Sequence, residues 1–240
     1  MKTKSVVIGL IFLCSVLTSC DHETIRAKGE VTTTEVSFSD YSGLQVSNAF
    51  NAFVTFSDTE EKIVIEANDN LHDRIIVKRD GNDVIIKLKN FTNVKGNATL
   101  NAYITTKNIS RFEISGASNL TLENEWIIEN ARIEISGASQ FTGELSTDDL
   151  QLDMSGASNA DLFGTARDVY ADLSGSSYLR DYDLQIKKLH IDLSGASSAF
   201  LSISESIDIQ ASGASRLMYK GDAVIDHKDL SGASEIIKKD

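Results

Sequence analysis

The stretch Leu152-Asp153-Met154-Ser155-Gly156-Ala157-Ser158 decides the fold of this chain, because its pattern recurs along the whole second half. Ser-Gly-Ala-Ser begins at residues 115, 136, 155, 194, 212 and 231, and Ser174-Gly175-Ser176-Ser177 fills the one gap. The spacings are 21, 19, 19, 20, 18 and 19 residues. Repetition at a near-constant spacing is the signature of an architecture in which each repeat buries its apolar side against its neighbours.

Residue types alternate as the chain approaches and leaves each turn. The residue just before the first serine is apolar in all seven copies, and the residue before that one is acidic in six of them. The fifth residue after the first serine is apolar in every copy: Leu120, Phe141, Ala160, Leu179, Ala199, Leu217 and Ile236. Alternation with a period of two is typical of a strand with one wet face. The sequence therefore predicts an all-β fold, a parallel β-solenoid (β-helix) with about 19–20 residues per coil.

The glycine of each turn is the candidate structural residue of the repeat. Glycine allows a backbone bend that a Cβ atom would oppose, and the small alanine and serine beside it let the same corner stack on itself. The predicted turn glycines are Gly116, Gly137, Gly156, Gly175, Gly195, Gly213 and Gly232.

The part of the chain that precedes the repeats is less regular but still predicts strands. Val84–Leu88 is one of several short runs rich in β-branched residues, Asp80-Gly81-Asn82 has the composition of a hairpin turn, and Val46–Phe50 stands where a degenerate turn could begin the stack. We interpret residues 35–240 as one β-helix domain, irregular over 35–106 and regular over 107–240. A separate small β domain for the irregular part is the alternative.

The first nineteen residues have the composition of a secretion signal. Lys2 and Lys4 precede an apolar run, Val6–Leu17, which is too short to span a bilayer as a helix. The run ends in Leu17-Thr18-Ser19-Cys20, which resembles the lipobox of bacterial lipoproteins. That resemblance implies a signal peptide over residues 1–19 and a lipid on Cys20. Residues 20–34 are then expected to form a flexible tether.

Charge and cysteine content narrow the partners and the compartment. The formal net charge of −12 argues against nucleic acid or an anionic membrane surface as a partner. Cys14 and Cys20 are the only cysteines, so the exported body holds no disulfide. We expect a protein of the cell envelope, anchored to the outer membrane through its lipid alone and facing the periplasm or the cell surface, with an extracellular glycan or protein as its partner.

The acidic residues of the repeat form the one candidate site. Asp153, Asp172 and Asp192 are expected to stack on neighbouring coils as a ladder. Like charges at strand spacing raise each other's pKa or attract a cation, and clustered carboxylates supply oxygens of the kind that calcium prefers. The alternatives are a solvated stripe that keeps the sheet soluble and a catalytic group of a polysaccharide-cleaving enzyme.

Other chemistry-bearing residues form no recognisable set. Arg111 and Arg132 lie two residues before the acidic position of the first two repeats. The later repeats have other residues at the same place, which are, in chain order, Gln151, Tyr170, His190, Asp208 and His227. The four histidines (His22, His72, His190 and His227) lack ligand spacing, so we expect neither a metal site nor a cofactor. Trp126 is expected in the core or in a loop, with a sugar-stacking platform as the alternative.

Most of the chain resembles a known family. Tyr41–Ser47 (YSGLQVS), Lys62–Leu71 (KIVIEANDNL), the Asp80-Gly81 turn and the acidic residue before each Ser-Gly-Ala-Ser resemble the putative auto-transporter adhesin, head GIN domain family, over about residues 36–236. The Gly-Ile-Asn of the family name is replaced by Ser47-Asn48-Ala49. The resemblance implies a right-handed, single-stranded parallel β-helix in an exported, often lipid-anchored, protein, and it supplies no catalytic or binding residue.

The leading expectation is therefore a non-enzymatic, adhesin-like binding or scaffold module. The competing hypothesis is a pectin-type lyase or hydrolase that uses the aspartate ladder. The last residues are expected to form a coil with an open strand edge. Either Lys238 and Lys239 prevent this edge from pairing with another strand, or the edge stacks end to end on a second molecule.

Overall fold

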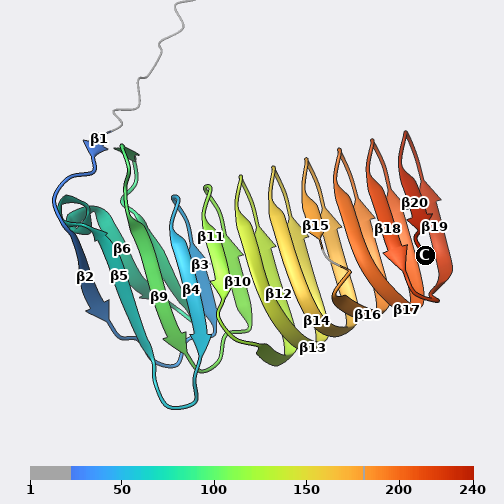
Figure 1. The fold of residues 1–240 in the computed structure, drawn as a ribbon, viewed down its shortest axis with the longest axis horizontal. Helices are drawn as coiled ribbons and strands as arrows, with labels where there is room; N and C mark the ends of the chain where they lie inside the picture. The colour runs from blue at the N-terminus through green and yellow to red at the C-terminus, as the bar shows by residue number, and fades with distance from the viewer. Residues whose placement is uncertain (1–22, 181) are drawn as a thin grey trace, which may run out of the picture.

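The computed structural model describes residues 23–180 and 182–240, and Cys20 with its signal segment lies outside these ranges. The predicted all-β solenoid is confirmed, with about seven stacked turns (Figure 1). The first part contains β1 (Glu23–Arg26), β2 (Val31–Val36), β3 (Gly43–Val46), β4 (Asn51–Phe56), β5 (Lys62–Asn68), the 3₁₀ helix η1 (Asp69–Arg74), β6 (Ile75–Asp80), β7 (Asp83–Leu88), β8 (Thr92–Lys95) and β9 (Leu100–Thr106).

The repeats form the second part, in which single strands run around the body of the solenoid. They are β10 (Arg111–Ile114), β11 (Asn119–Leu122), β12 (Trp126–Ile135), β13 (Gln140–Met154), β14 (Asn159–Leu173), β15 (Tyr178–Arg180), β16 (Leu184–Leu193), β17 (Ser198–Ala211), β18 (Arg216–Lys220), β19 (Val224–Leu230) and β20 (Glu235–Lys238). All pairings among them are parallel. The strands that lead into the turns present one outward surface, which we call the pre-turn face. The strands that leave the turns present another, which we call the post-turn face.

The turns stack because each one bonds to the turn before it. The seven predicted glycines have φ between +64° and +78°, the left-handed region that favours glycine. In the middle of the stack, the amide of Ser176 donates to the carbonyl of Gly156 at 2.7 Å. The last serine of each turn points inward: the Ser197 hydroxyl donates to the carbonyl of Ser194 at 2.9 Å and to that of Leu173 in the preceding coil at 3.1 Å. The small residues of the repeat therefore join coils as well as bend them.

The order of coils in space differs from their order in the sequence. β3 pairs with β7 on one side and with β10 on the other, and β4 lies in the same way between β9 and β11. The coil of residues 43–56 is thus inserted between residues 83–106 and residues 111–122, as the blue strands between green and yellow-green ones show in Figure 1. Asn48 and Ala49 both have positive φ and form the degenerate turn of this coil.

Antiparallel strands close the first end of the solenoid. β5 pairs antiparallel with β9, β2 with β5, and β6 with β7. Leu71 of η1 is completely buried and belongs to the same core as the coils. These strands cover the apolar interior that a parallel stack would otherwise leave open.

The prediction of a flexible tether over residues 20–34 is wrong for residues 23–34, the part of that segment that the structure describes. β1 pairs in parallel with β8, and β2 pairs with β5 from Val31↔Asn68 to Val36↔Ile63. Val31–Val36 reads VTTTEV, and its β-branched residues favour a strand where a free sheet edge is present. The antiparallel partner β5 provides that edge.

The last coil places lysines at the end of two apolar rows of the core. One row contains Phe112, Ile133, Leu152, Ala171, Ile191 and Ile209, and the last coil places Lys228, which is exposed, in register with Ile209. A second row contains Leu201 and Tyr219, and Lys238 follows Tyr219. The pairing also shifts register between Ile207 and Asp208. Lysines and irregular pairing at a sheet edge hinder strand addition, so these features oppose the end-to-end stacking of two molecules, which stays a prediction.

Candidate functional site

The predicted ladder forms on the pre-turn face. Asp153 of β13, Asp172 of β14 and Asp192 of β16 are direct neighbours in the parallel register, with Glu134 before them and Gln210 after them. Each of the three aspartates is exposed, while the residues on either side of it are buried. The structure therefore brings together all three residues that the sequence singled out, because the register keeps equivalent positions of successive coils side by side.

A second row runs beside the ladder, two residues earlier on the same strands. Its central members are Gln151, Tyr170 and His190, which are neighbours in the register. The rings of Tyr170 and His190 stack with their centroids 4.9 Å apart and their planes at 6°. His190 Nδ1 lies 3.6 Å from a carboxylate oxygen of Asp208 on the next strand. Sequence reasoning missed this pair, because the residue type at this position changes from coil to coil.

The two rows enclose a shallow hollow of about 370 Å³. Its floor and rim combine an aromatic stack, several carboxylates, two amides and one guanidinium group. The lining side chains that carry this chemistry are those of Arg132, Gln151, Asp153, Tyr170, Asp172, His190, Asp192, Asp208 and Gln210. Tyr170 is 49% exposed, so a ligand in the hollow would meet its ring directly.

Charge is distributed unevenly along the ladder. Arg132 donates to Asp153 at 2.9 Å and to Glu134 at 2.8 Å, so the first part of the ladder is compensated. Partial burial raises the pKa of Asp153; Arg132 opposes this rise, and the charges of Glu134 and Asp172 add to it. Among the described residues, Asp172 and Asp192 form no ion pair. The hollow is therefore electronegative at the end away from Arg132.

The groups that line the hollow are suited to binding a ligand. Within the described ranges, no group of three His, Cys, Asp or Glu side chains is arranged to hold a metal ion. Among the described residues, Asp153 is the one ladder aspartate that forms an ion pair, and its partner Arg132 is also engaged by Glu134. An exposed aromatic stack beside hydrogen-bonding groups can hold the apolar face of a ligand and orient its polar rim.

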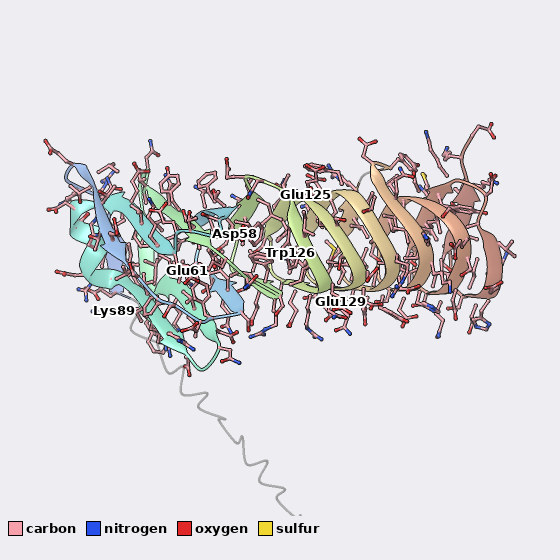
Figure 2. The ribbon with its side chains drawn as sticks, turned by 90° about the horizontal axis from the view of Figure 1, so that it is seen from below. Asp58, Glu61, Lys89, Glu125, Trp126 and Glu129 are labelled. Carbon is pink, nitrogen blue, oxygen red and sulfur yellow. The ribbon has the colours of Figure 1, made fainter. Side chains whose placement is uncertain are left out.

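The remaining sequence candidates lie elsewhere. His72 is bonded to the hydroxyls of Thr32 and Thr34 at 3.0 and 3.3 Å, and His227 is exposed on the last coil. Trp126 is 1% exposed and its Nε1 donates to the carbonyl of Ile109 at 2.8 Å, so it is a core residue and not a sugar platform. Figure 2 shows it where the irregular part meets the regular coils. His22 lies outside the described residues.

Solved structures similar to this chain include proteins from Bacteroides and Parabacteroides species. A putative adhesin from Bacteroides fragilis superposes with a TM-score of 0.80 at 21% identity, covering 89% of this chain and 97% of that one. A putative adhesin from Parabacteroides merdae gives 0.72 at 14% identity, over 90% and 99% of the two chains. A protein from Parabacteroides distasonis described as a putative lipid binding protein gives 0.73 at 18% identity, over 91% and 100%. These similarities show the fold alone.

Comparison at the level of sequence gives the family. No curated protein matches the chain. In the described part of the chain, no helix has the length and hydropathy needed to cross a membrane. The family model described as "Putative auto-transporter adhesin, head GIN domain" matches residues 40–223, which is most of the chain and includes the ladder, the hollow and nearly all of the turns. The chain therefore belongs to the putative auto-transporter adhesin, head GIN domain family.

Proposed function

We propose that this protein is an exported, lipid-anchored module of the cell envelope that binds an extracellular glycan or protein through the hollow on its pre-turn face, without catalysing a reaction. The observation that carries the proposal is the Tyr170–His190 stack, which is held in register with three unpaired or partly paired carboxylates. The family's adhesin description and its place at the cell surface or in the envelope support this reading.

The shape of the molecule also supports binding. A solenoid repeats each outward position from coil to coil, so a surface feature extends along the stack instead of ending in an enclosed pocket. Extended surfaces of this kind suit polymeric ligands, which can contact several coils at once. The carboxylates of Asp172 and Asp192 favour ligands that offer hydroxyl or amino groups.

Replacing Tyr170 with alanine is expected to weaken binding about tenfold, because the ligand loses the face of an aromatic ring. The measurement is titration of the purified full-length chain against the ligands that score in a glycan and matrix-protein array. His227→Ala is the matched control, since His227 occupies the equivalent position on the last coil and does not line the hollow. Arrays that are blank for every class of ligand, or equal losses in both variants, would count against the proposal.

The lipid anchor has its own test. The basic residues, the apolar run and the cysteine that follows it support processing before Cys20. Mass spectrometry of the mature protein is expected to find Cys20 as the first residue, carrying acyl chains, and Cys20→Ser is expected to move the protein from the membrane fraction to the soluble fraction. More than one chain is needed for stable anchoring. An unmodified Cys20 in the membrane-derived protein would rule the anchor out.

A further inference from the structure

A second ordered surface lies on the post-turn face, at the junction of the two parts of the chain. Five amide side chains occupy equivalent positions on five neighbouring strands and follow one another in register across the sheet. In spatial order they are Asn101, Asn51, Asn119, Gln140 and Asn159, which we call the amide row. Asn51 joins the row from an earlier part of the sequence, because the coil of residues 43–56 is inserted between its neighbours.

Hydrogen bonds run in one direction along the first part of this row. The amide group of Asn119 donates to Asn51 at 3.0 Å, Asn51 donates to Asn101 at 3.1 Å, and Asn101 donates to the carboxylate of Glu66 at 2.7 Å. The chain of donors therefore ends on a negative charge, which polarises the bonds in the same direction. Such a relay holds the amide planes in fixed orientations.

The relay leaves hydrogen-bonding capacity on Asn51 and Asn119 that is not used in the described part of the chain. A side-chain amide has two N–H donors and two acceptor sites on its oxygen. Asn51 donates once and accepts once within the row, and Asn119 donates once. Asn101 is more fully engaged, because it donates to Glu66 and is also hydrogen-bonded to the Tyr103 hydroxyl. Asn51 and Asn119 therefore each keep a donor and an acceptor site, which is the combination that a hydroxyl group matches, since a hydroxyl both donates and accepts.

An aromatic pair stands directly beside the amide row. Phe53 and Tyr103 lie two residues further along the strands that carry Asn51 and Asn101, and their rings stack with centroids 5.2 Å apart and planes at 15°. Tyr103 is 42% exposed. Its hydroxyl donates at 3.2 Å to the carboxylate of Glu66, the residue that ends the relay. The tyrosine is therefore fixed by a ring on one side and by a hydrogen bond at its tip.

The centre of this surface, around Asn51 and Phe53, is uncharged. Four of the outward neighbours of the amide row and the aromatic pair are threonines: Thr55, Thr105, Thr121 and Thr142. The carboxylates at its margins are Glu66, which ends the relay, and Asp161, which accepts from Gln140 at 3.2 Å. Lys62 is in register with Thr105, and its ammonium group forms an ion pair with Glu60. The patch thus differs from the pre-turn face, where carboxylates follow one another from coil to coil.

We propose that the amide row and the aromatic pair form a binding site for a neutral polysaccharide. A sugar ring has an apolar C–H face, which packs on Tyr103, and a rim of hydroxyl groups, which pairs with the free donor and acceptor sites of the amides. A linear chain that runs along the solenoid axis meets a new amide at each strand, about 4.8 Å further on. The site is independent of the acidic hollow, which lies on the other face.

The test measures binding of the purified full-length chain to cellulose-type, xylan-type and starch-type oligosaccharides, with polygalacturonate as the anionic comparator. We expect at least one neutral glycan to bind, and Tyr103→Ala to weaken that binding about tenfold. Tyr103→Phe, which keeps the ring and loses the bond to Glu66, is expected to have a smaller effect. Tyr170→Ala is the matched control, because Tyr170 is a similarly exposed tyrosine that lies on the pre-turn face.

Three outcomes overturn the inference. They are the absence of binding to every neutral glycan, binding to polygalacturonate alone, and equal losses for Tyr103→Ala and Tyr170→Ala. Circular dichroism of each variant shows whether the fold is intact. Where Tyr103→Ala fails to fold, a failure of Tyr103→Phe to alter neutral-glycan binding would also overturn it. Tyr170→Ala is expected to leave this binding unchanged, which separates the second site from the acidic hollow.

Discussion

Gly175→Ala is expected to lower the free energy of unfolding by about 1.5–3.5 kcal/mol. Gly175 has φ of +72°, where an L side chain costs about 1–2 kcal/mol. A Cβ atom at this position would lie 2.5 Å from the carbonyl oxygen of Gly156 in the preceding turn, closer than real Cβ atoms approach such an atom. That oxygen accepts the bond from Ser176, so the coils must separate and weaken a bond worth about 0.5–1.5 kcal/mol.

Gly81→Ala supplies the matched control. Gly81 also has positive φ, at +61°, but a Cβ atom there would meet nothing within 4 Å. Its substitution by alanine is expected to lower the free energy of unfolding by only about 1 kcal/mol, because only the backbone conformation opposes it. Urea unfolding followed by far-UV circular dichroism measures both variants. Equal losses would show that the stacking of the turns adds nothing, and that backbone conformation is the only reason for glycine in the repeat.

The regular coils could be predicted from the sequence because one register fixes every side chain in them. Once Ser115 and its six counterparts are aligned, the ladder from Asp153 to Asp192 follows without a structure. Lys228 and Lys238 can be found in the same way, as charged residues of the last coil that are aligned with apolar rows. An alignment of the repeats of a solenoid therefore predicts which residues of neighbouring coils lie side by side.

The junction could not be predicted, because its contacts depend on chain order in space. Asn51 and Asn101 are fifty residues apart in the sequence, and only the inserted coil of residues 43–56 makes them neighbours. β2 also pairs with β5 at long range, from Val31↔Asn68 to Val36↔Ile63, although across a shorter separation. Tyr170 and His190 were visible as variable residues of the repeat, but a variable position gives no sign that two of its members stack.

Trp126→Ala is expected to cost about 3–5 kcal/mol, as is usual when a large buried aromatic residue is truncated. Its ring contacts Phe112 of β10 edge to face at 4.9 Å and is parallel to that of Phe56 of β4 at 6.3 Å, while its Nε1 donates to Ile109. The side chain thus joins the inserted coil, the first regular coil and the connection between them. Truncation is expected to uncouple the two parts of the chain as well as destabilise them.

Trp126→Phe separates packing from hydrogen bonding at this junction. It keeps most of the apolar contact but leaves the carbonyl of Ile109 without its donor, at an expected cost of about 1–3 kcal/mol. In the unmodified protein, Trp126 is the only tryptophan, so its fluorescence reports on the junction while circular dichroism reports on all strands. The two signals are expected to change at the same urea concentration, because the junction belongs to one continuous core. If fluorescence changes first, the two parts unfold separately, and the junction is a weak boundary instead of the bond between them.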